Sequence, residues 1–184
     1  MPFLEILTRC HKRPNMLQRN IASIANQTDG DFIHTLLVDE QGVGVAGAWA
    51  KLRDYAPRLA GDYIWILDDD DECVRPSLVE DLKAIVAQHA PDVIMLKMDH
   101  AQWGVKPSSS WGGMPVMGDI GCSAFVVRRD IWQLHAAEAW QETRYQSDYD
   151  FIASIFNGGY TVAWYDVVAS RVQRISKGEP EVAA

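Results

Sequence analysis

The sequence predicts a single α/β domain with a mainly parallel central sheet and helices on both of its faces. Six apolar, β-branched runs have the length of buried strands, and segments with helical spacing of apolar residues separate the first four of them. Strands and helices that alternate in this way form right-handed βαβ crossovers, which build a parallel sheet covered on both sides. The length of 184 residues allows one core of ordinary size rather than two domains of typical length.

Each predicted strand is a run of Ile, Leu, Val and aromatic residues between turn-forming or charged residues. The predicted strands cover residues 3–8, 32–39, 62–68, 92–98, 122–127 and 161–168. The predicted helices cover residues 14–27, 45–56, 76–90, 129–140 and 147–157. Pro14 and Pro76 open two of these helices, because the first helical turn does not need the N–H group that proline lacks.

The regular alternation stops after residue 98, where Gly, Pro and Ser residues form the irregular segment 99–121. A loop of this length in a compact domain is usually either a functional lid or disordered, and its two tryptophans make a plain linker less attractive. Trp103 and Trp111 lie within it and are candidates either for stacking on a sugar or base or for fixing the loop. The residues after 172 are expected to form a flexible tail.

Composition and charge exclude several classes of function. The formal net charge of -8 repels phosphate backbones, and no run of Lys and Arg residues marks a nucleic-acid surface. No apolar stretch reaches the roughly 18 to 20 residues of a membrane-spanning helix, and the N-terminal run contains Glu5 and lacks a small-residue cleavage site. The three cysteines are widely spaced, which disfavours a disulfide framework and a zinc site. We therefore expect a cytoplasmic protein without a membrane span.

Four consecutive aspartates, Asp68 to Asp71, directly follow the apolar residues of the third predicted strand. They lie at a carboxyl edge of the predicted sheet, where α/β proteins bind their ligands. Mg²⁺ or Mn²⁺ is commonly held by one or two carboxylates together with substrate phosphates, and it relieves the repulsion between neighbouring carboxylates. Because side chains alternate along an extended segment, Asp68 and Asp70 are the predicted metal ligands, and Asp69 and Asp71 are expected to face elsewhere. The alternative is a solvated acidic turn.

Two further strands are predicted to end at the same edge. Asp39 ends the second one in "LLVDEQGVGVAG" and is a candidate either to accept hydrogen bonds from a base or ribose or to cap the next helix. The first strand ends in "TRCHKRP", which contains Thr8, Arg9, His11, Lys12 and Arg13. Cationic side chains at this edge form charge-assisted hydrogen bonds to a diphosphate, although basic residues ahead of a helix are also common in solvated loops.

In their order and spacing these motifs are similar to the family 2 glycosyltransferases of GT-A fold, which use nucleotide-sugar donors. The residues that carry the resemblance are "LEILTRCHKRPNMLQRNIASIANQT", "DFIHTLLVDE", "GDYIWILDDDDECVRPSLVEDL" and "DIGCSAFVVRRD". The resemblance implies a Rossmann-like GT-A domain over residues 1–172. Within it, residues 1–98 form the nucleotide-sugar-binding half and residues 99–172 the acceptor-binding and catalytic half, followed by a flexible tail at 173–184.

The same resemblance implies a donor and a cofactor. The donor is a nucleotide-diphospho-sugar, with a UDP-sugar favoured, and the cofactor is Mn²⁺ or Mg²⁺ on Asp68 and Asp70, which occupy the place of the family's D-x-D pair. The residues expected to bind the donor and its cation are Thr8, Arg13, Asp39, Asp68 and Asp69.

A catalytic base is implied at the start of a late helix, where inverting members of the family carry an acidic motif. The stretch "QSDYDFIASIF" supplies Asp148 and Asp150 there, and the resemblance favours Asp148 as the base. At i, i+2 spacing on a helix the two carboxylates point to different faces, so only one of them readily enters a cleft. The alternative is that both acids stabilise the N-terminus of the helix.

The sequence thus favours a metal-dependent, inverting glycosyltransferase that moves a sugar from a nucleotide-diphosphate donor to an acceptor hydroxyl. The acceptor (a glycan, a lipid-linked glycan or a protein) stays open, as does assembly into a homo-oligomer. A non-catalytic nucleotide- or glycan-binding module is the alternative that the short chain and Ser147, in place of the usual Glu, favour. A sugar-phosphate nucleotidyltransferase is a further alternative, although the Gly-rich first loop of that class is missing.

Overall fold

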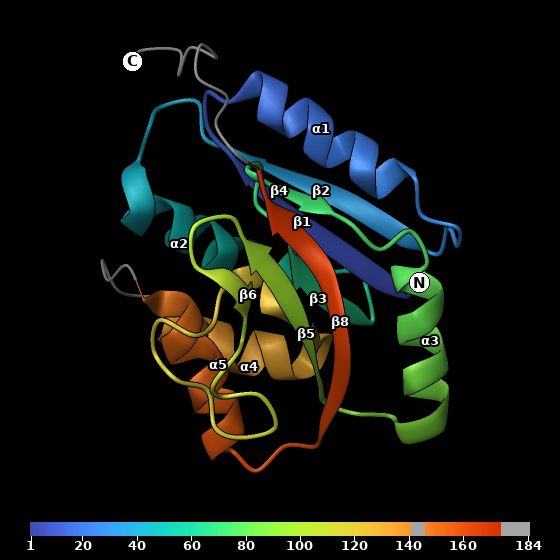
Figure 1. Cartoon of the computed structure of the whole chain (residues 1–184). Coiled ribbons are helices and arrows are strands. Elements are labelled where there is room, and N and C mark those ends of the chain that lie inside the picture. Colours follow the sequence, from blue (N-terminus) through green and yellow to red (C-terminus); the bar gives the residue numbers. More distant parts are fainter. Residues whose placement is uncertain (141–145, 174–184) are drawn as a thin grey trace.

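A curved β-sheet runs through the middle of the molecule, with helices on both of its faces (Figure 1). The structure, a computed structural model, describes residues 1–140 and 146–173. The strands are β1 (Leu4–Cys10), β2 (Phe32–Val38), β3 (Tyr63–Ile66), β4 (Asp71–Cys73), β5 (Val93–His100), β6 (Gly104–Lys106), β7 (Phe125–Arg128) and β8 (Val162–Val172). The helices are α1 (Pro14–Ala25), α2 (Gly44–Tyr55), α3 (Leu78–His89), α4 (Arg129–Ala139) and α5 (Ser147–Asn157), with short 3-10 turns at Ala56–Arg58 and Cys122–Ala124.

The sheet is mixed, so the prediction of a mainly parallel sheet is wrong. The strand order is β2-β1-β3-β7-β5-β8-β4, and β6 pairs with β5 off this path. β1 is parallel to β2 and β3, and β5 is parallel to β8, whereas β7 lies between β3 and β5 and is antiparallel to both. The chain reaches β7 through a segment without an α-helix, and a connection without a crossover helix does not impose a parallel entry.

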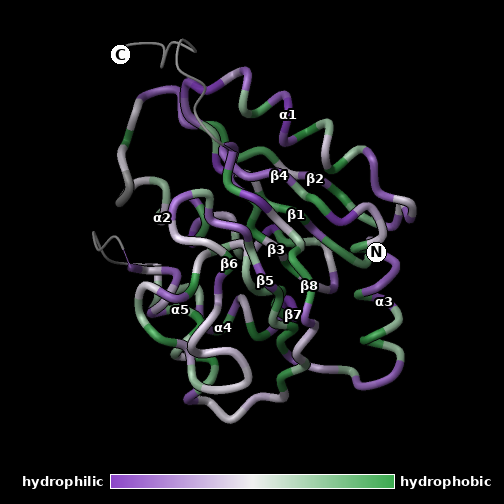
Figure 2. Tube along the Cα trace, in the orientation of Figure 1, coloured by the Kyte–Doolittle hydropathy of each residue, from purple (hydrophilic) through white to green (hydrophobic). Residues whose placement is uncertain are grey.

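The predicted helices are confirmed, and each begins and ends within two residues of its expected bounds. The prediction of helices on both faces is confirmed as well. α1 and α3 pack on one face through side chains such as Ile24 and Leu82, and α2, α4 and α5 pack on the other through side chains such as Trp132 and Phe151. The alternation of side chains along β3 explains this. Trp65 packs in the core between the sheet and α1 and α3, whereas its neighbour Ile64 packs in the core on the face of α2, α4 and α5. Figure 2 shows the resulting hydrophobic centre and the alternating hydropathy along α1 and α3.

Three short or extended elements differ from the prediction. β4 begins at Asp71, the last residue of the acidic run, where no strand was expected, and pairs antiparallel with β8. β8 reaches Val172 and is therefore longer than the predicted strand. β6 forms a hairpin with the end of β5 inside the segment that was predicted to be irregular.

The C-terminal part of the chain begins as an ordered segment. Gln173, the first residue of the predicted tail, is buried, and its backbone N–H donates to the carbonyl oxygen of Asp70 at 2.7 Å. Its side-chain amide donates to the carbonyl oxygens of Met16 and Asp69, each at 3.1 Å. The rest of the predicted tail, residues 174–184, lies outside the described residues. Of the helices in the described part of the chain, none has the length and apolar character needed to cross a membrane.

Candidate functional site

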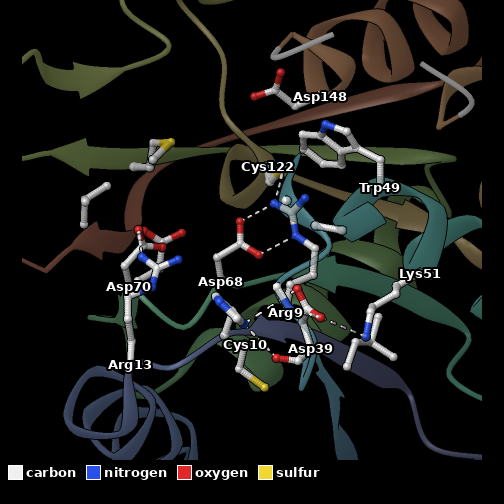
Figure 3. A pocket seen from close by; sticks show the side chains of 18 of the residues that line it. Arg9, Cys10, Arg13, Asp39, Trp49, Lys51, Asp68, Asp70, Cys122 and Asp148 are labelled. Carbon is white, nitrogen blue, oxygen red and sulfur yellow. Dashed lines mark hydrogen bonds and ion pairs between the residues drawn. The ribbon is translucent and has the colours of Figure 1, made fainter. Parts of the chain in front are cut away.

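A cavity of about 500 Å³ opens at the carboxyl ends of β1, β2 and β3 (Figure 3). Side chains from each of these strand ends line it, together with side chains from α2, β5, the turn at Cys122 and the first turn of α5. The first three strands run parallel, so their carboxyl ends meet at one edge of the sheet, which is the usual ligand-binding edge of an α/β fold.

The four aspartates form a tight turn between β3 and β4 rather than an extended segment. The N–H of Asp71 donates to the carbonyl oxygen of Asp68 at 2.9 Å, which closes the turn. Asp68, Asp70 and Asp71 line the cavity, whereas the buried Asp69 turns away from it and accepts the N–H of His11 at 3.0 Å. Asp69 therefore faces elsewhere, as expected, but Asp71 does not, because a turn does not keep the two-residue alternation of a strand.

Asn20 of α1 fixes the backbone of this turn through hydrogen bonds. Its side-chain amide donates to the carbonyl oxygens of Leu67, Asp68 and Asp71 at 3.2, 2.9 and 3.0 Å. Asn20 is completely buried, so these bonds satisfy carbonyl groups that would otherwise lose their contact with water. α1 therefore positions the acidic turn as well as the core.

Two arginines neutralise the carboxylates of the turn. Arg9 binds both carboxylate oxygens of Asp68, through Nε at 2.7 Å and through its terminal nitrogen. Arg13 bridges two aspartates, with one terminal nitrogen 2.6 Å from Asp70 Oδ2 and the other 3.0 Å from Asp69 Oδ1. Burial raises the pKa of Asp69 to about 6, against the effect of Arg13. Burial and the charges of Asp70 and Asp68 raise the pKa of Asp71 well above its usual range.

Arg9 is also the link between the acidic turn and the opposite wall of the cavity. Its guanidinium lies over the indole of Trp49, 4.0 Å from the ring centroid, and 3.7 Å from Sγ of Cys122. Figure 3 shows Trp49 between Arg9 and Asp148. A guanidinium that is stacked on an aromatic ring and bound bidentately by a carboxylate has little freedom to move.

Asp39 lines the cavity and at the same time shapes the loop between β2 and α2. Its carboxylate accepts the N–H groups of Gln41, Gly42 and Val43 at 3.2, 3.0 and 2.7 Å. Gly42 and Gly44 have φ angles of 75° and 70°, which glycine adopts without the strain of a side chain. The loop thus bends close to the cavity edge, and the carboxylate of Asp39 fixes it by accepting N–H groups ahead of α2, whose N-cap residue is Val43.

Asp148 lies in the first turn of α5 and lines the cavity opposite the acidic turn. Its carboxylate accepts the N–H of Tyr149 at 2.8 Å. Burial raises its pKa to about 6, although this hydrogen bond and the charge of Arg9 act in the opposite direction. A carboxylate with this pKa is ionised at neutral pH and is still a competent proton acceptor, as a general base requires.

The predicted site residues fall into two groups. Arg13, Asp39, Asp68, Asp70 and Asp148 line the cavity together. Thr8, Asp69 and Asp150 are not among the lining residues. The hydroxyl of Thr8 is buried, 2.7 Å from the carbonyl oxygen of Leu67 and 2.8 Å from Nε2 of His34, so Thr8 joins β1 to its neighbouring strands.

Sequence reasoning did not assign Trp49, Asp71 or Cys122 to the site, although all three line the cavity. The helical pattern around Trp49 indicates a buried face, which gives no sign that this face meets a cavity. Within the part of the chain that the structure describes, the buried Nε1 of Trp49 has no hydrogen-bond partner. An unpartnered donor in a cavity wall is a feature that only the structure could reveal.

The acidic turn fits a hard divalent cation as a partial ligand set. No group of three or more His, Cys, Asp or Glu side chains in residues 1–140 and 146–173 is arranged to hold a metal ion. Asp68 and Asp70 nevertheless present carboxylates to the same cavity, and one or two carboxylates are what Mg²⁺ or Mn²⁺ takes from a protein when phosphate oxygens and water complete the shell. The donor set therefore suits a cation that binds together with a diphosphate.

Comparison with known proteins places the fold. No sequence-family model matches the chain, and no curated protein matches it in sequence. S. aureus TarS (residues 1–349) in complex with UDP is 12% identical, with a TM-score of 0.71 over 94% of this chain and 60% of that chain. TarS with UDP-GlcNAc gives a TM-score of 0.68 at 12% identity over 99% of this chain and 61% of that chain.

A second protein gives the same result. The mannosyltransferase PcManGT from Pyrobaculum calidifontis, in complex with GDP-Man and Mn²⁺, is 13% identical, with a TM-score of 0.67 over 96% of this chain and 58% of that chain. The chain thus spans about 60% of the length of the TarS fragment. Identity this low establishes the fold alone, and that fold is the GT-A fold of the glycosyltransferases.

Proposed function

We propose that this protein is a glycosyltransferase that moves a sugar from a nucleotide-diphosphate donor to an acceptor hydroxyl, with inversion at the anomeric carbon. The observation that carries the proposal is the position of Asp148, a half-buried carboxylate with a pKa of about 6, in one cavity with Asp68, Asp70 and Asp39. The GT-A fold adds support, because the fold neighbours bind UDP-GlcNAc or GDP-Man.

Asp148 acts as the general base in this proposal. The acceptor oxygen attacks the anomeric carbon, its proton moves to the Asp148 carboxylate, and the bond between the sugar and the nucleotide diphosphate breaks. Asp148 is held by the N–H of Tyr149 at the start of α5, so its carboxylate is oriented before the acceptor arrives.

The opposite wall of the cavity binds the leaving group. Asp39 and the glycine loop next to it suit the nucleoside, because they offer a carboxylate acceptor and close backbone approach. Arg13 lies next to Asp70 and provides a guanidinium for the diphosphate. Mn²⁺ or Mg²⁺, held by Asp68 and Asp70, would neutralise charge on the departing diphosphate. A UDP-sugar is the favoured donor, and GDP-sugars are the first alternative.

Binding tests the donor half of the proposal. We expect one of UDP, GDP, CDP and dTDP to raise the melting temperature of the protein in the presence of Mn²⁺ and much less without it, because a ligand that binds only the native state stabilises it by mass action. Asp70→Asn should abolish the shift. The matched control is Asp54→Asn, since Asp54 also pairs with an arginine but is exposed and does not line the cavity. The proposal fails if no nucleotide shifts the melting temperature.

Turnover tests the catalytic half. We expect Asp148→Asn to keep nucleotide binding and to lose about two to four orders of magnitude in sugar transfer, or in hydrolysis of the donor by water, because the base is missing. Asp150→Asn is the matched control, an acid in the same helical turn that does not line the cavity, and should retain activity. Nucleotide binding without release of sugar from any nucleotide-sugar would identify a non-catalytic binding module instead.

A further inference from the structure

The two arginines that neutralise the acidic turn differ in how firmly they are held. The side chain of Arg9 is 15% exposed, binds both oxygens of Asp68 and lies on the face of Trp49. The side chain of Arg13 is 38% exposed and makes one contact with each of two carboxylates, Asp70 and Asp69. Arg13 can therefore leave its partners by rotating its side chain, whereas Arg9 cannot move without breaking a buried bidentate pair and an aromatic contact.

We propose that Arg13 is an exchangeable counter-ion of the acidic turn. It pairs with Asp70 while no divalent cation is bound, and when the cation binds to Asp70, Arg13 moves to the diphosphate of the donor. The inference rests on the proposed function for the identity of the diphosphate, but the competition between Arg13 and a cation for Asp70 stands on the geometry alone. Arg9 keeps Asp68 in both states and serves as its positioning residue.

The contact between Arg13 and Asp70 makes the competition direct. A guanidinium nitrogen lies 2.6 Å from Oδ2 of Asp70, on a carboxylate that also faces the cavity. A divalent cation bound to that carboxylate would meet the positive charge of Arg13 at close range, and like charges repel strongly at such distances when they are partly shielded from water. Cation binding at Asp70 therefore competes with the ion pair to Arg13, which is the more exposed and less firmly held of the two arginines, and this ion pair lowers the cation affinity of the nucleotide-free protein.

The rest of the turn tolerates the departure of Arg13. Asp69 loses an ion pair but keeps the N–H of His11 at 3.0 Å. The backbone of the turn stays bound to Asn20, and the N–H of Gln173 stays on the carbonyl oxygen of Asp70. The turn thus keeps its shape through backbone contacts while the side chain of Asp70 changes partner.

The proposal predicts effects of opposite sign on two ligands when Arg13 is replaced. Without its guanidinium, Asp70 is open to the cation, so Mn²⁺ binds the nucleotide-free protein more tightly. The diphosphate loses a cationic partner, so the nucleotide binds the Mn²⁺-saturated protein more weakly. A residue that only supports the structure of the site would weaken both ligands when replaced.

The experiment is a Mn²⁺ titration of the nucleotide-free protein, followed by electron paramagnetic resonance of the free ion. We expect Arg13→Gln to lower the Kd for Mn²⁺ about tenfold relative to the wild type, within the range typical of coupled sites. Arg75→Gln is the matched control, because Arg75 pairs with Asp81 at 2.8 Å and its side chain is 41% exposed, but it does not line the cavity. Asp70→Asn should bind Mn²⁺ more weakly than either.

A second variant keeps the test decisive if Arg13→Gln does not fold. Arg13→Lys keeps the positive charge but cannot bridge two carboxylates, so its Kd for Mn²⁺ should lie between those of the wild type and Arg13→Gln. Circular dichroism of each variant shows whether it is folded. An unchanged or higher Kd for Mn²⁺ in a folded Arg13→Gln or Arg13→Lys protein overturns the exchange.

A second measurement, nucleotide binding at saturating Mn²⁺, separates this inference from the proposed function. With saturating Mn²⁺, the Kd of the best nucleoside diphosphate should rise about tenfold in Arg13→Gln and stay unchanged in Arg75→Gln. If Arg13→Gln tightens Mn²⁺ but no nucleotide binds the wild type, the competition at Asp70 stands and the donor assignment fails. If nucleotides bind the wild type with Mn²⁺ but Arg13→Gln weakens both ligands, the proposed function stands and the exchange is overturned.

Discussion

At the scale of single residues, surroundings separate two acids that the sequence presents as a pair. Asp148 and Asp150 both lie in the first turn of α5, but only Asp148 lines the cavity. Burial raises the pKa of Asp148 to about 6, and Arg9 and the N–H of Tyr149 keep it from rising further. The position of a carboxylate on a helix therefore decides which one serves the chemistry, because two residues along a helix turn a side chain to another face.

This pKa predicts how sugar transfer depends on pH. A general base works when it is ionised, so kcat/KM should fall about tenfold per pH unit below about pH 6 and level off above it. The profile is measured with the wild type and with Asp150→Asn between about pH 4.5 and 8, with stability checked at each pH. Both proteins should share the inflection, and a rate that stays constant through pH 6 rules out Asp148 as the base in this pH range.

At the scale of elements, the segment between β6 and β7 is fastened rather than loose. The buried carboxylate of Asp119 accepts hydrogen bonds from the backbone N–H groups of Ser108 and Ser110, and the ammonium of Lys106 lies 2.9 Å away. Trp111 packs edge-on against Trp164 with ring centroids 4.9 Å apart. The segment is therefore held in place in the described structure, and Trp111 is a residue that fixes the loop.

The set of donors around Asp119, called the Asp119 cage here, consists of Lys106, Ser108 and Ser110. Its hydrogen bonds predict that substitution of Asp119 lowers the stability of the protein. Although burial opposes it, hydrogen bonds from Lys106, Ser110 and Ser108 hold the pKa of Asp119 far below its usual range. Asp119→Asn should lower the free energy of unfolding by about 3 kcal/mol at pH 7, because a buried acceptor of several charge-assisted bonds is lost. Urea unfolding measures the difference, with the exposed Asp54→Asn as the control.

The same substitution has a defined pH dependence. Folding depresses the pKa of Asp119. Its contribution to the free energy of unfolding is therefore complete above the pKa of the unfolded state, about 4, and is lost as the pH falls toward the pKa of the folded state. The difference between wild type and Asp119→Asn should therefore shrink below about pH 4. A difference that is under about 1 kcal/mol at pH 7 contradicts the assigned role of the cage.

At the scale of the whole molecule, the two halves of the chain share one sheet. β7 belongs to the second half, yet it lies between β3 and β5 of the first half and pairs with both. β8 then pairs with β5 on its other side. The nucleotide-sugar-binding half predicted at residues 1–98 thus depends on strands from residues 99–172 for the centre of its sheet.

This interleaving predicts that the first half does not fold by itself. A fragment of residues 1–98 would expose both edges left by β7 and the core side chains that Phe125 and Val126 cover. We expect it to show no cooperative thermal transition by circular dichroism, while the whole chain shows one. A cooperative melt of the fragment would contradict the single-unit structure.

The sequence by itself determined the elements and the edge at which the site lies. Apolar spacing is a local property, so the helices and most strands follow from it, as does the place of Asp39, Asp68 and Asp70 at strand ends and of Asp148 at a helix start. The acidic run could be recognised as a candidate cation site for the same reason.

Only the tertiary structure decided how these residues meet. The reversed direction of β7, the turn that brings Asp71 into the cavity, and the position of Trp49 in the cavity wall are not encoded in any short pattern. The contact of Arg9 with Asp68 joins residues 59 positions apart, and its contact with Cys122 spans 113 positions. Such contacts depend on the path of the whole chain, because the packing of distant segments, rather than local periodicity, selects which charges become partners.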